Sequence, residues 1–151
     1  MQKITPFLWF NDNAEEAMNF YLSVFKNSKV LGKIPGPNGK ALGVTFELNG
    51  QKIRGLNGGP IYKLSPAISL FVDCETQAEV DELWKKLGEG GREDRCGWLT
   101  DKFGLSWQII PSILGKLLSD PDRVKANNVM QAMLKMQKID IATLEKAYNQ
   151  K

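Results

Sequence analysis

The hydrophobic positions of this chain change their spacing at regular intervals, and the spacing predicts alternating strands and helices. Residues 4–10 form a short apolar and aromatic run, which is typical of a buried strand. Residues 11–13 are polar and offer side-chain caps to a following helix. Apolar side chains then recur every three or four residues as far as position 25, which is the spacing of one helix face.

The rest of the first half predicts three strands. Residues 29–34 and 41–48 each read as a strand, and a turn rich in proline and glycine separates them. The dipeptide Asn49–Gly50 favours a two-residue hairpin turn, so residues 51–56 are expected to fold back on residues 44–48. Residues 57–60 close this half.

The second half repeats this order of elements. Residues 65–72 predict another strand, and Thr76 with Glu79 forms a capping box at the start of a helix. Four apolar residues supply the buried face of that helix: Val80, Leu83, Trp84 and Leu87. Residues 96–111 predict a closing hairpin that turns at residues 101–104. The pattern therefore predicts an α+β fold of two tandem βαβββ modules, at residues 1–60 and 61–111.

The last part of the chain, residues 112–151, predicts a C-terminal helical extension. Residues 112–118 read as a short helix, and Asp120–Pro121 reads as a cap with proline at the first position of the next helix. Asp140 is expected to begin the final helix. An apolar stripe lies between these points: Val129, Met130, Met133 and Leu134. We expect the extension to pack on the sheet or on a partner subunit, and residues 1–151 to form a single domain.

Composition and charge exclude several classes of function. The chain has 151 residues, of which 42% are hydrophobic, with no apolar run long enough for a membrane span. Its first residues lack the apolar segment of a secretory signal, so we expect a cytoplasmic protein with no membrane partner. The 20 basic residues are interleaved with 17 acidic ones, which argues against a nucleic-acid partner.

The absence of histidine is the most restrictive feature of the composition. It removes His-based zinc and iron sites and any Ser-His or Cys-His nucleophilic pair. No pair of acidic residues has a spacing that suggests an acid/base couple. The glycine-rich turns at residues 36–40 and 55–59 are not placed between a strand and a helix, so no nucleotide-derived cofactor is expected.

The closing hairpin carries the main candidate for a functional residue. Its second strand alternates between two faces, with Leu105, Trp107 and Ile109 on one face and Ser106, Gln108 and Ile110 on the other. Two interpretations of Gln108 stay open, because a buried amide needs partners. The side chain is satisfied within the sheet or by water, or it orients a ligand in a pocket. The same alternation predicts that Trp107 packs under a helix.

Four further residues are candidates for a ligand pocket. Asn57 is either a pocket amide or a conformational residue beside a glycine turn. Ser69 is placed to add a hydroxyl to the pocket. Trp9 and Trp98 either form an aromatic wall for a flat organic ligand or pack in the core.

The two cysteines, Cys74 and Cys96, do not form a CxxC pair and are expected to be free thiols. Arg92 and Arg95 lie close to Cys96 in the sequence and would lower the pKa of its thiol. Cys96 is therefore a possible reactive thiol, although the chain has no histidine to act as its base. The alternative is a structural thiol.

The order of elements and several short motifs resemble the PhnB-like branch of the vicinal oxygen chelate superfamily. This superfamily includes glyoxalase I, bleomycin-resistance proteins and extradiol dioxygenases, and the branch is often labelled a 3-demethylubiquinone-9 3-methyltransferase domain. The resemblance covers almost the whole chain. The motifs that carry it lie at residues 5–10, 13–17, 20–21, 56–60, 96–98, 104–108 and 130–144.

The resemblance implies two curled sheets around a cavity and a metal held by one residue from each of four strands, usually His or Glu. The corresponding positions in this chain fall near Pro6 or Phe7, near Asn57, near Ala67 and on Gln108. Pro, Phe and Ala side chains cannot bind a metal, and neutral amides bind divalent transition ions weakly. We therefore expect no tightly bound catalytic metal.

Three functional hypotheses follow from these observations. The first is a metal-free protein, expected to be a homodimer, that binds an unidentified small molecule in an apolar cavity with a few polar groups, namely Asn57, Ser69 and Gln108. The second is an enzyme, either the methyltransferase of the family label or a metal-dependent lyase or dioxygenase with atypical ligands. The third is an interaction module whose methionine-bearing C-terminal helices bind a partner.

Overall fold

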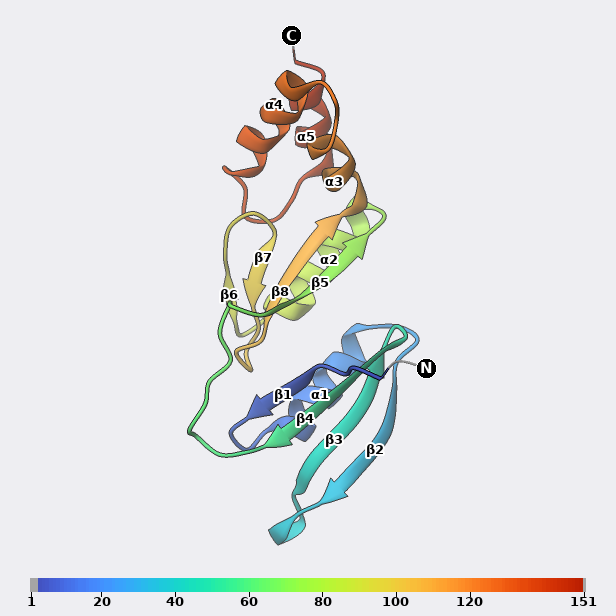
Figure 1. Ribbon diagram of the computed structural model, residues 1–151, viewed down its shortest axis with the longest axis vertical. Helices are drawn as coiled ribbons and strands as arrows, with labels where there is room; N and C mark the ends of the chain where they lie inside the picture. The colour runs from blue at the N-terminus through green and yellow to red at the C-terminus, as the bar shows by residue number, and fades with distance from the viewer. Residues whose placement is uncertain (1–2, 151) are drawn as a thin grey trace. The chain divides into compact units, whose positions relative to one another are not determined.

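A computed structural model describes residues 3–150 of the chain. The chain divides after Ser65 into two compact units, and each unit has its own four-stranded sheet. Figure 1 shows that each sheet is accompanied by a helix of the same unit. The two βαβββ modules are confirmed, whereas the division at residues 60 and 111 stays a prediction. Among the described residues, no helix has the length and apolarity to cross a membrane.

The first unit contains the first βαβββ module. Its elements are β1 (Phe7–Phe10), α1 (Ala14–Val24), β2 (Lys29–Pro35), β3 (Ala41–Leu48) and β4 (Gln51–Asn57). The strand order is β1-β4-β3-β2, in which β1 runs parallel to β4 and the other pairs are antiparallel. The hairpin turn at Asn49–Gly50 forms as predicted, with φ of 46° and 88°.

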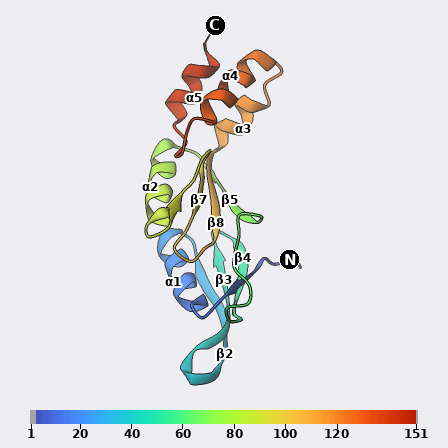
Figure 2. The same cartoon turned by 90° about the vertical axis from the view of Figure 1, so that its left-hand side faces the viewer.

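Helix α1 covers one face of this sheet (Figure 2). Alternation along β3 directs Val44, Phe46 and Leu48 toward the helix, and all three are buried. The ring of Tyr21 in α1 stacks on Phe46 with ring centroids 6.3 Å apart. The other face of β3 carries Thr45, and none of the helices described in this unit covers that face.

The start of α1 is held by a residue from β4. Asn57 accepts a hydrogen bond from the backbone N–H of Ala14 at 2.8 Å and donates one to the carbonyl oxygen of Ala41 at 2.8 Å. The predicted local cap is wrong in this respect, because Asn13 makes no side-chain capping bond. The Asn57 amide therefore ties the first turn of the helix to two strands of the sheet.

The second unit repeats the βαβββ order and adds three helices. Its sheet elements are β5 (Ser69–Cys74), α2 (Gln77–Gly88), β6 (Arg92–Glu93), β7 (Trp98–Thr100) and β8 (Ser106–Pro111). The strand order is β5-β8-β7-β6, with β5 parallel to β8 and the remaining pairs antiparallel. All four apolar residues predicted for the inner face of α2 are buried.

The capping box at the start of α2 forms in a modified way. The Thr76 hydroxyl accepts a hydrogen bond from the backbone N–H of Glu79 at 3.2 Å, as predicted. The Glu79 carboxylate accepts from the backbone N–H of Glu75, at 3.0 Å, and so reaches one residue beyond the cap. The first bond satisfies a donor that the helix itself leaves without a partner, and the second binds the N–H of the residue before the cap.

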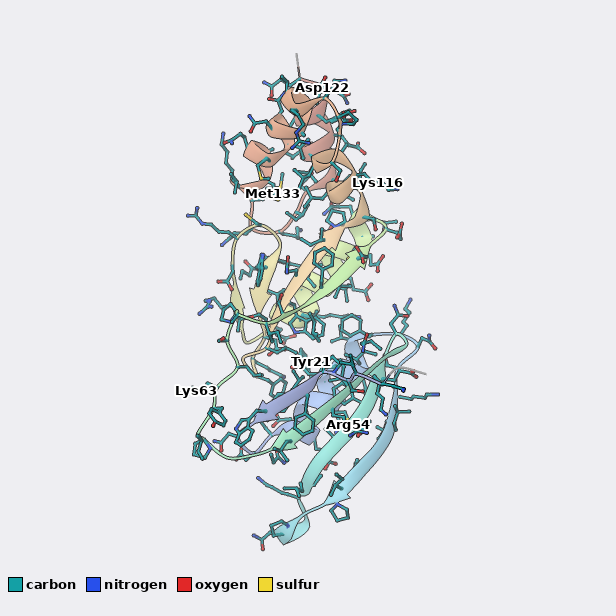
Figure 3. The ribbon with its side chains drawn as sticks, in the orientation of Figure 1. Tyr21, Arg54, Lys63, Lys116, Asp122 and Met133 are labelled. Atoms are coloured by element: carbon teal, nitrogen blue, oxygen red, sulfur yellow. The ribbon has the colours of Figure 1, made fainter. Side chains whose placement is uncertain are left out.

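Two predicted element boundaries are wrong. The strand predicted at residues 65–72 begins later, at Ser69, because residues 66–68 lie in a turn and pairing with β8 starts at Ser106. The second helix of the extension begins after Asp122 and not after Asp120 (Figure 3). Asp122 caps the helix by accepting from two backbone N–H groups, while Asp120 accepts from the Tyr148 hydroxyl at 2.6 Å.

The extension comprises α3 (Ser112–Leu118), α4 (Arg123–Met133) and α5 (Ile141–Tyr148). The predicted starts of α3 and α5 are confirmed, the latter with Asp140 as its cap. The helices share one buried cluster with the end of β8, and its residues are Ile110, Leu114, Val129, Ile139 and Leu144. The extension thus packs on its own sheet. The predicted stripe on α4 is only partly buried, since Met130 is 36% and Leu134 is 47% exposed.

Backbone hydrogen bonds also attach the extension to the segment before β7. The N–H groups of Cys96 and Gly97 donate to the carbonyl oxygens of Met136 and Gln137, at 2.9 and 2.8 Å. Both donors have left-handed backbone angles, with φ of 59° at Cys96 and 83° at Gly97. Gln77, at the start of α2, donates to the carbonyl oxygen of Ile139 and accepts from the backbone N–H of Ile141, the first residue of α5. This set of contacts fixes the chain immediately before Trp98.

We predict that Gly97→Ala destabilises the protein far more than Gly90→Ala. Both glycines have positive φ, but a Cβ at Gly97 would lie 2.6 Å from Ile110 Cδ1, whereas at Gly90 the nearest atom would be 3.4 Å away. We expect the free energy of unfolding to fall by about 3 kcal/mol for Gly97→Ala and by about 1 kcal/mol for Gly90→Ala. Urea unfolding of both variants measures the difference, and equal losses would contradict it.

We also predict that Asn57→Ala lowers the free energy of unfolding by about 2 kcal/mol, because it removes the α1 cap and leaves the N–H of Ala14 and the carbonyl of Ala41 without their partner. Asn19→Ala serves as the control, since Asn19 lies exposed on the same helix. The control should change the stability by less than about 0.5 kcal/mol. A stability loss for Asn57→Ala no larger than that of the control would disprove the capping role.

Candidate functional site

The sheet of the second unit has one face under α2. On its opposite face, Ile110 at the end of β8 packs against the extension, whereas no described helix of this unit covers the rest of that face (Figure 2). We call this opposite face the open face. Alternation along β8 is confirmed, because Trp107 is buried on the α2 side. The strand register arranges two rows of residues on the open face, namely Trp98–Gln108–Phe71 and Thr100–Ser106–Ser69.

A buried carboxylate at the β7–β8 turn fixes this register. Asp101 is 3% exposed and accepts hydrogen bonds from the backbone N–H groups of Phe103 and Leu105, at 2.8 and 3.1 Å. Its second oxygen accepts from Trp107 Nε1 at 2.9 Å. The turn and the tryptophan on the α2 side are therefore held by one side chain, which brings Trp98 opposite Gln108 on the open face.

The structure brings together three of the predicted pocket residues on this face. Gln108 Nε2 donates a hydrogen bond to Ser69 Oγ at 3.0 Å, and Trp98 lies beside Gln108 on the neighbouring strand. Within the described part of the chain, Gln108 Oε1 accepts no hydrogen bond. Phe71, which the sequence did not single out, lies on the other side of Gln108 and is 54% exposed. Its place in the β5–β8 register is the signal that identifies it.

Ser106 is a second residue that sequence reasoning missed. It is 1% exposed, and its hydroxyl has no hydrogen-bond partner among residues 3–150. A buried polar group without a partner destabilises a fold by about 1–3 kcal/mol. Ser106 was predicted to share a face with Gln108, but only the three-dimensional structure shows that its hydroxyl lacks a partner.

Charged groups on this sheet lie at its margins, with Arg92 and Asp94 paired at the β6–β7 edge and Asp73 exposed near the end of β5. Arg92 Nε donates to Asp94 Oδ1 at 2.9 Å, and the Thr100 hydroxyl donates to Asp94 Oδ2 at 3.2 Å. The row that contains Gln108 holds only a neutral amide and two aromatic rings. The centre of the open face is therefore uncharged.

Trp9 and Asn57, the other two predicted pocket residues, belong to the first unit. Trp9 Nε1 donates to the carbonyl oxygen of Gly59 at 2.9 Å, and its ring meets that of Tyr62 edge to face at 5.0 Å. A Cβ at Gly58 would lie 2.4 Å from the indole, so the glycine turn accommodates this ring. Asn57 uses both ends of its amide to hold α1, as described above.

Both cysteines are free thiols, as predicted. Burial raises the pKa of Cys74 to about 12, and the neighbouring Glu79, Asp73 and Glu75 carboxylates add to this effect. Cys96 is half-buried beside the extension. Its role as a reactive thiol stays a prediction.

The residues at the metal-binding positions that the resemblance implies do not fit a transition metal. Phe7 and Ala67 carry no donor atom, and the Asn57 amide is engaged at both ends. Gln108 retains one neutral oxygen, which alone is a weak ligand for such ions. Among residues 3–150, no three His, Cys, Asp or Glu side chains lie close enough to form a metal site.

Comparisons with known proteins identify the group to which the chain belongs. Residues 2–110 match the 3-demethylubiquinone-9 3-methyltransferase family. The PhnB protein of Bacillus cereus is 36% identical, with a TM-score of 0.69, and the alignment covers 74% of this chain and 100% of that protein. The helices α3, α4 and α5 begin after residue 110 and so lie outside the matched range.

More distant structures share the fold. A protein from Pseudomonas aeruginosa is 20% identical, with a TM-score of 0.62 over 74% of this chain and 98% of its own. The fosfomycin resistance protein FosX of Listeria monocytogenes is 14% identical, with a TM-score of 0.52 over 71% of this chain and 90% of its own. That protein was crystallised with Mn(II) and a dihydroxypropylphosphonic acid.

No curated protein matches this chain. The family match spans most of the chain, and the Bacillus cereus protein is 36% identical, so these two comparisons establish the family. The chain belongs to the PhnB-like 3-demethylubiquinone-9 3-methyltransferase family, and it shares its fold with the Pseudomonas aeruginosa protein and with FosX.

Proposed function

We propose that this chain is a metal-free protein that binds a small molecule on the open face of its second sheet. The observation that carries the proposal is the state of Gln108, which stands at the last metal-binding position of the superfamily. Its amide nitrogen is fixed by Ser69, and its amide oxygen points to no partner within residues 3–150. A fixed amide with one unused oxygen orients a ligand by hydrogen bonding, without a metal.

The neighbours of Gln108 supply the apolar part of such a site. Trp98 and Phe71 lie on the two strands that flank β8, at the same level as Gln108. Aromatic side chains at these positions provide flat surfaces for an organic ligand on both sides of the amide. In the first unit, Trp9 stays a candidate through its ring, whereas both polar ends of Asn57 serve the fold.

The metal-free part of the proposal is supported by donor chemistry. Stable binding of zinc, iron, manganese or nickel needs several imidazole, thiolate or carboxylate ligands. The four expected positions supply one available amide oxygen between them. The residues therefore favour direct binding of an organic ligand over chemistry at a metal.

Methyl transfer is the second candidate, and the description of the matched family favours it. It requires a site for a methyl donor such as S-adenosylmethionine. The glycine-rich turns at residues 36–40 and 55–59 lie between β2 and β3 and between β4 and β5, and within residues 3–150 neither leads from a strand into an α-helix. This arrangement supports binding without methyl transfer.

We predict that purified protein contains no stoichiometric transition metal and that its ligand perturbs the NMR signals of the Gln108 amide and the Trp98 indole. The compounds tested for binding form a panel of zinc, iron, manganese, nickel, S-adenosylmethionine, quinones and small phosphonates. Affinity for a binding compound should fall at least about tenfold in Gln108→Leu, because a hydrogen bond in the site is lost. Gln131→Leu, at an exposed position on α4, is the matched control and should bind as the wild type does.

Three results would contradict this proposal. Stoichiometric metal in elemental analysis would reject the metal-free site. Turnover of S-adenosylmethionine with a quinone acceptor would establish the enzyme instead. A panel in which no compound affects Gln108 would reject the open face as the binding site.

We also propose that the protein is a homodimer. The support comes from apolar side chains that stay exposed on strands of the first sheet, with Phe7 at 58% and Ile34 at 60%. Exposed apolar groups of this kind are typical of interfaces. We predict that light scattering gives the wild type twice the chain mass of 16.9 kDa. If the dimer forms through the face that carries Phe7, the Phe7→Ser variant should have the mass of a single chain. A monomeric wild type would reject the dimer.

A further inference from the structure

We infer that the ligand group that meets Gln108 is uncharged and both donates and accepts hydrogen bonds, and that the Ser106 hydroxyl is one of its partners. This inference rests on the proposed function, because it places the ligand on the same open face. It goes further by assigning the chemical class of the ligand and a binding role to a residue that the family resemblance does not single out.

The hydrogen-bonding capacity left on the face defines the class. Gln108 Oε1 is an acceptor without a donor among the described residues, so it calls for a donor on the ligand. Ser69 Oγ already accepts from Gln108, so its own proton is directed to a further acceptor. A carboxylate or a fully ionised phosphonate offers acceptors alone, and an ammonium offers donors alone. A carboxamide or a hydroxy-carbonyl group offers both.

The charge distribution points the same way. The row Trp98–Gln108–Phe71 contains no charged side chain, and Arg92 at the sheet edge is paired with Asp94 at 2.9 Å. An ionised ligand group at Gln108 would lose water without gaining an opposite charge, which is unfavourable. A neutral group loses less hydration and recovers it through the amide and the hydroxyls.

The buried hydroxyl of Ser106 lowers the stability of the free protein, so stability does not explain why this position is a serine. Ser106 lies between Thr100 and Ser69 in the register and next to the row of Gln108, and its buried hydroxyl has no partner within residues 3–150. Alanine at this position would remove the unsatisfied group with little change in volume. Because Ser106 is 1% exposed, a ligand reaches the hydroxyl only after the group that covers it moves. The binding of a ligand group would then supply the missing hydrogen bond.

Benzamide and benzoate form a matched pair of probes for the ligand class. They share a flat ring and nearly the same shape, but benzoate is ionised at pH 7 and lacks a donor. We expect benzamide to shift the Gln108 side-chain amide and Trp98 indole signals in an NMR titration, with a Kd of about 1–10 mM, the range for a ligand of this size. Benzoate should bind at least about tenfold more weakly.

Ser106→Ala tests the role of the hydroxyl, because the two expected effects have opposite signs. The melting temperature should rise by about 2–4 °C, since an unsatisfied buried group is removed. The affinity for benzamide should fall about fivefold, since one hydrogen bond to the ligand is lost. Ser119→Ala, at an exposed position after α3, is the control and should change neither quantity appreciably.

The possible outcomes separate this inference from the proposed function. Benzoate binding as tight as that of benzamide would overturn the uncharged class. A lower melting temperature for Ser106→Ala, or unchanged benzamide affinity, would overturn the role of Ser106. If neither benzamide nor benzoate shifts the NMR signal of the Gln108 amide but another compound of the panel does, this inference fails and the proposed site stands. If no compound does so, both fail.

Discussion

The carboxylate of Asp101 is the interaction on which the candidate site depends. It is buried, and it holds the β7–β8 turn through two backbone N–H groups while its second oxygen anchors the Trp107 indole. A strand register that slips by one residue exchanges the two faces of the strand. By fixing the turn and the indole together, Asp101 keeps Trp107 under α2 and Gln108 on the open face. A carboxylate in this position is thus structural, although an acidic residue beside a candidate site suggests catalysis at first sight.

The two faces of β8 have different roles, one in the stability of the unit and the other in the proposed binding. The residues that face α2 are apolar and fully buried, and they carry the packing energy of the unit. On the other face β8 carries the polar residues Ser106 and Gln108 and, at its end, the buried Ile110, and Ser106 lacks a hydrogen-bond partner in the described part of the chain. The unit tolerates this because the opposite face is complete. An open face with unused polar groups has the properties that recognition of a ligand requires.

Much of this arrangement could be predicted from the sequence, because it depends on local periodicity. The faces of β8 and α2 follow from spacings of two and of three to four residues, and the hairpin at Asn49–Gly50 follows from its turn residues. The partners of Asn57 and Trp9 could not be predicted in this way. Asn57 reaches a residue 43 positions away and Trp9 one 50 positions away, and such contacts exist only after β1 pairs with β4. The missing partner of Ser106 is likewise a property of its surroundings in space.

The extension is attached to the sheet at residues whose conformation is local but whose hydrogen bonds are long-range. Cys96 and Gly97 have left-handed backbone angles, and their N–H groups bind carbonyl oxygens from the segment between α4 and α5. Gly97 also accepts a hydrogen bond from the N–H of Ile109, so the same residue is bound to the extension and to β8. Trp98 follows at once and lies opposite Gln108. The helices beyond the matched family range are therefore tied to the candidate site through the backbone of Cys96 and Gly97, and a side chain at Gly97 would crowd Ile110 of β8 and Ile139 of the extension.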